Sequence, residues 1–175
     1  MEGLVHIYTG DGKGKTTAAV GLGLRAWGRG KRVLMVQFLK EMESGELTAI
    51  DKLGEGFMVN RGRFMNKFTW EMGEGERKEA AALQNQQLEY AWKEMKTDQW
   101  DMLILDEIMA AITTGMIPPE DVLALIDDKP DRLELVLTGR NAPDQLVDAA
   151  DYVSEIREVK HPFQRGIGAR RGIED

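Results

Sequence analysis

The residues best suited to chemistry lie in one short segment, TGDGKGKTT at Thr9–Thr17. Binding a chain of phosphates requires inward-pointing backbone N–H groups, glycines that let the backbone approach, a cation and a hydroxyl for Mg²⁺. The segment offers three glycines, the Lys15 ammonium and the Thr16 hydroxyl. A helix starting here adds the positive end of its dipole. The candidate ATP ligands are Gly10, Asp11, Gly12, Lys13, Gly14, Lys15, Thr16 and Thr17.

This segment departs from the strict phosphate-loop pattern, which requires glycine at the position occupied by Thr9. The alternative is a glycine-rich turn between strand and helix that holds no ligand. The run GKGKTT in this setting favours triphosphate binding.

A second candidate group follows the apolar run MLIL, where Asp106 and Glu107 stand together. A carboxylate at a strand end orients Mg²⁺ beside a phosphate loop, directly or through water. Asp106 is the first metal candidate, with Thr16 and Glu107 as further ligands. The alternative is a pair of acids that caps a helix.

Arg140 follows another apolar run, in LVLTGR. Ligands of an open parallel sheet collect beyond the carboxyl ends of its strands, so Arg140 is a candidate ATP contact. A surface arginine in a turn explains the same pattern equally well.

The elements that position these groups alternate between apolar runs and helical patterns. This order predicts an α/β fold with an open, mostly parallel sheet flanked by helices on both faces. Helices are predicted over 16–27 and about 76–96, and near Pro118 and Pro143. The expected strands are 4–8, 33–39, 57–59, 102–105, 133–137 and 152–156.

Length and composition limit the function. The 175 residues predict one domain, 1–175. Thirty acidic against 23 basic residues give a net charge of −7, which disfavours nucleic acid as a partner. The lack of cysteine and the two histidines exclude disulfides, thiolate catalysis and most zinc sites. No apolar run approaches the ~20 residues of a membrane span, and no signal peptide is evident, so we expect a cytoplasmic protein.

Two segments fall outside the alternating pattern. Residues 60–75 mix arginine and lysine with aromatic side chains, and residues 160–171 hold basic residues and no acid. We expect the first to be functional, because long irregular loops usually are. The second is either a binding segment for an anion or a solvated C-terminus.

Several segments, including those described above, resemble the ATP:corrinoid adenosyltransferases of the CobA/BtuR type. They follow the same order along nearly the whole chain. They are TGDGKGKTTAA, GRGKRVLMVQFLK, FTWE, MLILDE, LVLTGR and ADYVSEIREVKHPF. The resemblance implies a P-loop fold of the RecA-like branch. We also note one strand run between the loop strand and the acid strand in the chain, an order like that of this branch.

The resemblance implies that ATP gives its 5′-deoxyadenosyl group to Co(I) of a corrinoid, a cobalamin or a precursor, and that triphosphate is released. The nucleophile is the metal, so the enzyme needs no nucleophilic side chain. Lys15, Thr16 and Glu107 are the candidate catalytic residues, and Mg²⁺ or Mn²⁺ the cofactor. Arg25 is implied as a weaker ATP contact.

In the same family, aromatic residues lie against the lower face of the corrin ring and exclude the axial ligand, which makes Co(II) easier to reduce. Phe68 and Trp70 occupy these positions here, although two aromatics in a loop also suit a core. A flavoprotein reductant and a homodimer are further implications.

Three features differ from the family pattern. The chain begins three residues before its first expected strand, so another element or the partner subunit is expected to close the site. Asp11 stands where relatives often have asparagine, and Gly168 where they tend to have lysine. Two other functions remain open, an ordinary P-loop ATPase or kinase and a nucleotide-switched binding module.

Overall fold

The chain forms one six-stranded parallel sheet in a computed structural model that describes residues 2–39, 44–62 and 71–173. The strands are β1 (Val5–Thr9), β2 (Val33–Gln37), β3 (Phe57–Asn60), β4 (Met102–Asp106), β5 (Glu134–Thr138) and β6 (Tyr152–Glu155). Their order across the sheet is β3-β2-β4-β5-β1-β6. All six expected strands and the parallel sheet are therefore confirmed.

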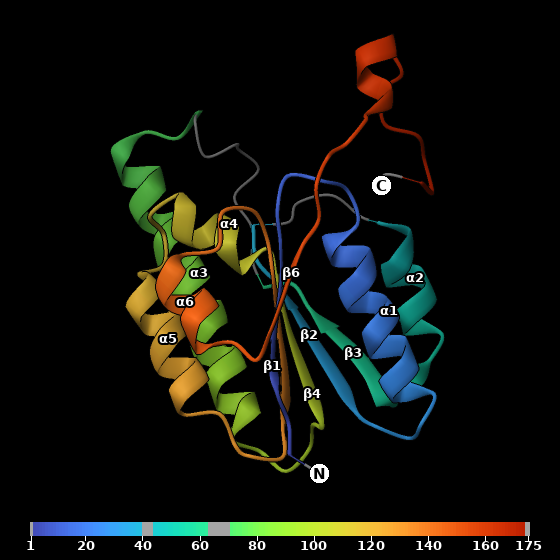
Figure 1. Cartoon of the computed structure of the whole chain (residues 1–175). Coiled ribbons are helices and arrows are strands. Elements are labelled where there is room, and N and C mark those ends of the chain that lie inside the picture. The colour runs from blue at the N-terminus through green and yellow to red at the C-terminus, as the bar shows by residue number, and fades with distance from the viewer. Residues whose placement is uncertain (1, 40–43, 63–70, 174–175) are drawn as a thin grey trace.

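Helices cover both faces of this sheet (Figure 1). The helices are α1 (Lys15–Trp27), α2 (Gly45–Asp51), α3 (Glu74–Met95), α4 (Ile108–Thr113), α5 (Pro119–Asp127) and α6 (Asp144–Ala149). The sequence indicated α1, α3, α5 and α6. It did not indicate α2 and α4, which have seven and six residues and are too short for a clear apolar period.

Strand order explains why α1 and α2 lie on one face and α3 to α6 on the other. From β1 through β2 to β3 the chain moves towards one edge, and from β3 through β6 it moves back. Crossovers between parallel strands are almost always right-handed, so reversing the direction moves the helices to the opposite face. The predicted two-faced covering follows from this reversal.

Strand order also corrects one expectation. Two strands, β2 and β3, lie between the loop strand and the acid strand along the chain, and not one. The single strand that separates β1 from β4 in the sheet is β5, which comes later in the sequence. One strand does separate the loop strand from the acid strand within the sheet, as the RecA-like order requires. The prediction was wrong in placing that strand between them along the chain.

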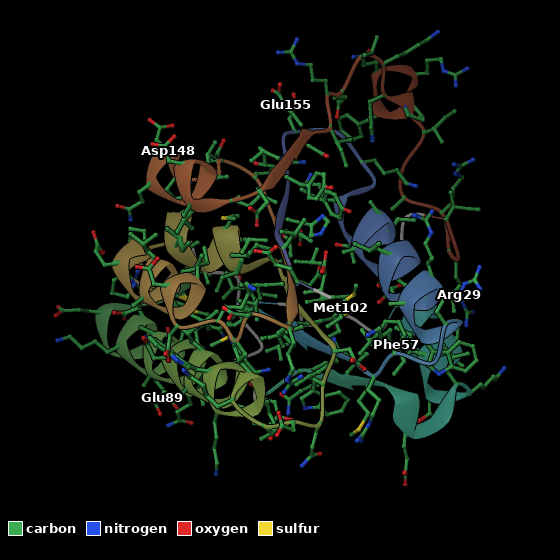
Figure 2. The ribbon with its side chains drawn as sticks, turned by 60° about the horizontal axis from the view of Figure 1, so that its bottom comes forward. Arg29, Phe57, Glu89, Met102, Asp148 and Glu155 are labelled. Carbon is green, nitrogen blue, oxygen red and sulfur yellow. The ribbon has the colours of Figure 1, made fainter. Side chains whose placement is uncertain are left out.

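The core has two parts, one on each face of the sheet. Leu103 and Leu105 of β4 face α3 to α6, whereas Ile104 faces α1 and α2. Figure 2 shows Phe57 and Met102 within the α1 side of the core, whereas Glu89 and Asp148 point outwards. A Cβ on Gly23 of α1 would lie 2.9 Å from the Phe57 ring, so glycine lets this helix pack closely on the sheet.

The strands β2, β4 and β5 are buried almost throughout, whereas β6 is an exposed edge strand. After β6 the chain rises beyond the sheet into a short 3-10 helix, Pro162–Arg165 (Figure 1). Among the described helices, none has the length and apolar character that crossing a membrane requires.

Candidate nucleotide and metal site

The carboxyl ends of four neighbouring strands bring the predicted site residues together. Asp106 ends β4, and it pairs in register with Gln37 at the end of β2. On the other side of β4, Thr138 ends β5, which in turn pairs with β1 and places the phosphate loop next to it. Parallel strands present their carboxyl ends at one edge, which is where open α/β sheets bind ligands.

Asp106 is the centre of a buried hydrogen-bond network. Its Oδ1 accepts hydrogen bonds from the Thr16 hydroxyl at 2.8 Å and from the Thr138 hydroxyl at 2.7 Å. Gln37 Nε2 donates to Oδ2 at 3.2 Å. Asp106, Gln37 and Thr138 are fully buried. Charge-assisted hydrogen bonds of this kind fix a carboxylate in one orientation, so the acid strand and the phosphate loop form one unit.

Lys15, the cation of the phosphate loop, is a buried residue. Its Nζ donates to the Gly12 carbonyl oxygen at 2.8 Å, and the residue is only 8% exposed. Burial lowers the pKa of Lys15, the positive charge of Arg140 lowers it further, and Glu107 and Asp11 partly offset these effects. A triphosphate would relieve both unfavourable causes, because it supplies negative charge next to the buried ammonium.

The glycines of the loop serve two different purposes. Just after β6, the Ile156 carbonyl oxygen would lie 2.4 Å from a Cβ on Gly10, and the Arg157 carbonyl carbon 2.7 Å from a Cβ on Gly12. Gly14 has φ +119° and nothing within 4 Å of its Cβ position. Close packing of the chain therefore requires Gly10 and Gly12, whereas Gly14 provides the left-handed turn that starts α1.

Backbone hydrogen bonds also hold the loop against the segment after β6. Gly12 N donates to the Ile156 carbonyl oxygen at 2.8 Å, and Ile156 N donates to the Thr9 carbonyl oxygen at 2.8 Å. The Thr9 hydroxyl accepts from Ala142 N at 3.3 Å, which ties β1 to the loop after β5. Glycine, which the strict pattern has at this position, could not accept this hydrogen bond.

Asp11 turns towards the segment after β6. Its Oδ1 accepts from Glu158 N at 3.2 Å. The pKa of Asp11 is held below its usual value, first by this backbone hydrogen bond and also by the charges of Arg140 and Lys15. The Asp11 carboxylate at this position thus makes a hydrogen bond within the protein.

Arg140 and Glu107 both lie close enough to the loop to act on Lys15 electrostatically. Glu107 has φ +60° and begins α4, but its side chain makes no capping hydrogen bond to that helix. Its backbone N–H donates to the Thr138 hydroxyl at 3.0 Å. The structure thus gives no support to a helix-capping role for the Glu107 side chain, and it places the charge of Arg140 near Lys15.

One predicted ligand, Arg25, is not brought to this cluster, and two others cannot be placed relative to it. Arg25 is exposed in the last turn of α1, ten residues after Lys15 and about 15 Å away along the helix axis. Phe68 and Trp70 lie outside the described residues.

Sequence reasoning missed Gln37 and Thr138. Each is a polar residue that ends an otherwise apolar strand, in VLMVQ and LVLT. A polar residue at the end of an apolar strand was the available signal, because the same feature had identified Asp106. The two residues were missed because an amide and a hydroxyl are less conspicuous than a carboxylate.

The side chains gathered here suit a magnesium ion bound together with a nucleotide. Mg²⁺ binds proteins through one or two carboxylates together with substrate phosphates and keeps several waters. Thr16 and Asp106 are joined at the loop, and Gln37 Oε1 is buried without a hydrogen-bond partner in the described part of the chain. The described residues contain no cluster of three or more acidic or histidine side chains, so phosphate oxygens would have to complete the shell.

Comparison with known proteins gives a consistent result. The family described as ATP:corrinoid adenosyltransferase BtuR/CobO/CobP matches residues 1–174. A corrinoid adenosyltransferase of Escherichia coli strain K12 is 35% identical over 98% of this chain and 85% of its own length. Corrinoid adenosyltransferase CobA of Salmonella typhimurium is 37% identical, with the same coverage. The Pseudomonas aeruginosa enzyme of the same name is 36% identical over 98% of this chain and 83% of its own.

Among solved structures, domain III of the replication initiation protein DnaA from Thermotoga maritima aligns with a TM-score of 0.44 and 16% identity. The alignment covers 87% of this chain and 53% of that one. The family match spans nearly every residue and includes the phosphate loop, the acid strand and the strand ends described above. The chain therefore belongs to the ATP:corrinoid adenosyltransferase family.

Proposed function

We propose that this protein transfers the 5′-deoxyadenosyl group of ATP to Co(I) of a corrinoid and releases triphosphate. The observation that carries the proposal is the Thr16–Asp106 hydrogen bond of 2.8 Å beside buried Lys15, which unites a phosphate loop with an acid strand. Family membership supplies the acceptor, because a phosphate loop by itself does not specify which bond of ATP is broken.

The role of the protein in this reaction is to bind, orient and stabilise charge. The reduced cobalt attacks the ribose 5′ carbon, the C–O bond to the α-phosphate breaks, and the bonding electrons leave with triphosphate. Lys15 and the loop amides stabilise the negative charge that develops on the leaving group. No cysteine is present in the sequence, and none is needed, because the attacking atom belongs to the substrate.

Thr16, Asp106 and Glu107 are proposed to hold Mg²⁺, or Mn²⁺ in its place, together with the triphosphate. When bound, the ion would neutralise charge on the leaving group. Arg140 would contact the nucleotide from the rim of the site, and Arg25 remains a weaker proposed contact. A flavoprotein reductant, a homodimer and a cytoplasmic location are proposals from the family.

Product analysis tests the function. The protein is incubated with ATP, Mg²⁺ and a Co(I) corrinoid under dim light, and the products are separated. We expect a light-sensitive Co–C bond and triphosphate in equal amounts. ADP and phosphate as the only products, with or without corrinoid, would instead indicate an ordinary P-loop ATPase.

The double variant Phe68→Ala, Trp70→Ala tests the proposed exclusion of the axial ligand. Removing the rings is expected to leave activity with chemically prepared Co(I) within about threefold, since that step needs no electron. Activity that starts from Co(II) with a reduced flavoprotein should fall at least about tenfold, the scale seen for groups that tune a metal from outside its ligands. Equal losses in both assays would contradict this role.

A further inference from the structure

Gln37 is a buried residue of the site to which the proposed function gives no role. It ends β2, is fully buried, and pairs in register with Asp106 on the adjacent strand. Its Nε2 donates to Asp106 Oδ2 at 3.2 Å. One half of its amide thus holds the carboxylate that ends the acid strand.

The other half of the amide has nothing to bind within the described part of the chain. The Asp106 carboxylate is an acceptor, so the NH₂ group must face it, and the carbonyl oxygen Oε1 faces away. A buried carbonyl oxygen without a partner is unfavourable, and such atoms usually mark a missing water, ion or ligand. A glutamine that only filled space would be better replaced by an apolar side chain.

The chemistry of Oε1 restricts what it can bind. It accepts hydrogen bonds and donates none, so it cannot pair with phosphate oxygens, which are also acceptors. Two kinds of donor accompany Mg·ATP, the waters that Mg²⁺ retains and the ribose hydroxyls. The waters are favoured, because Gln37 is bonded to Asp106, the side chain best placed to hold the ion.

We propose that Gln37 is a positioning residue for the divalent cation, with Nε2 holding Asp106 and Oε1 accepting a hydrogen bond from a water of the ion's hydration shell. This inference rests on the proposed function, which brings ATP and the cation to the site. Gln37 then contributes to nucleotide binding only when the cation is present.

The test compares nucleotide binding with and without metal. Gln37→Met keeps the length of the side chain and removes both polar atoms. Calorimetric titration with ATP in Mg²⁺ or in Mn²⁺ should show about tenfold weaker binding, the lower end of effects for groups around a metal. Titration in EDTA should show binding within about twofold of the unchanged protein.

Gln84→Met is the matched control. Gln84 is also a buried glutamine, but its Oε1 already accepts from Leu39 N at 3.2 Å. This variant should bind ATP like the unchanged protein in all three titrations. If Gln37→Met does not fold, as judged by circular dichroism, Gln37→Asn withdraws the same groups by one methylene and should show the same metal-dependent loss.

Two results would overturn the inference. One is a Gln37 variant whose binding is unchanged, or falls equally with and without metal. The other uses 2′-deoxyATP and 3′-deoxyATP: if the unchanged protein discriminates against one of them and Gln37→Met does not, Oε1 faces the sugar. Failure of the proposed function would look different, because a protein that forms only ADP and phosphate can still show the metal-dependent effect of Gln37.

Discussion

Two sides of the nucleotide site are built in different ways. The inner wall, made by Thr16, Gln37, Asp106 and Thr138, is held by hydrogen bonds between side chains, and its three strand-end residues are fully buried. The outer rim is made by Asp11, Arg140 and the segment 156–158. Its Asp11, Arg140 and Glu158 are exposed, and backbone atoms make most of its contacts with the loop.

This difference indicates what each side does. Buried charges are costly to leave unpaired, so the inner wall is suited to fix an ion and its ligands with little freedom. Exposed polar contacts contribute little because water competes for them, so the rim sets the shape of the loop more than the strength of binding. Removing polar groups of an inner-wall side chain should therefore have a larger effect than removing those of a rim side chain.

The largest effect is expected for Asp106→Asn. This change removes the negative charge at the centre of the inner wall and leaves an NH₂ group facing donors. We expect kcat/KM for adenosyl transfer to fall at least about 100-fold, the scale of losing a preorganised charged group. Steady-state assays at saturating Mg²⁺ measure this, and a loss below tenfold would mean that Asp106 does not hold the ion.

Gly12→Ala tests whether the rim shapes the loop. Its Cβ would lie 2.7 Å from the Arg157 carbonyl carbon, so the loop or the segment after β6 must move. We expect ATP binding to weaken about tenfold or more, because overpacking typically costs 1–3 kcal/mol. Gly21→Ala on α1 is the control, since its Cβ site is open and the change should stabilise the helix by roughly 0.5–1 kcal/mol. Unchanged ATP affinity in Gly12→Ala would show that the segment after β6 can move away from the added methyl group without affecting the site.

Thr138→Val is expected to have an intermediate effect. Valine keeps the shape but cannot donate to Asp106 or accept from Glu107 N. Mg·ATP affinity should fall roughly tenfold, the lower end of effects for groups that orient metal ligands. Thr113→Val, which loses only a bond to the Met109 carbonyl oxygen, serves as the control and should bind normally. Equal Mg·ATP affinity in the two variants would show that the Thr138 hydroxyl does not support binding.

The smallest effect is expected for Asp11→Ala, and it should depend on pH. The pKa of folded Asp11 lies below its ordinary value of 3.8, so its contribution to stability is present above about pH 3.8 and is lost as pH falls through the folded pKa. Urea unfolding should show the unchanged protein slightly more stable than Asp11→Ala at pH 6, and the difference should vanish in acid. A difference that grows in acid would contradict the contact with Glu158.

Much of the fold was predictable because its signals are local. Continuous apolar runs marked the six strands, and the spacing of apolar residues marked α3. The phosphate loop was recognisable because its glycines, lysine and threonine are consecutive in the chain. Asp106 could be named from its place after an apolar run, and the family from motifs spread along nearly the whole chain.

The partners of these residues could not be predicted, because they depend on which strands become neighbours. Asp106 is 69 positions from Gln37 and 32 from Thr138, and the three residues meet only through the order β2-β4-β5. In the same way, the sequence explained Gly10 and Gly12 by the approach of phosphate, whereas the structure relates them to the backbone after β6.

The sequence by itself determined that a phosphate loop and an acid strand are present, because each is a short segment whose residue types carry its chemistry. The tertiary structure alone decided that the Thr16 hydroxyl, the Asp106 carboxylate and the Gln37 amide meet in one buried network. The physical reason is that strand pairing and right-handed crossovers set the order of the sheet, and that order selects which strand ends face one ligand.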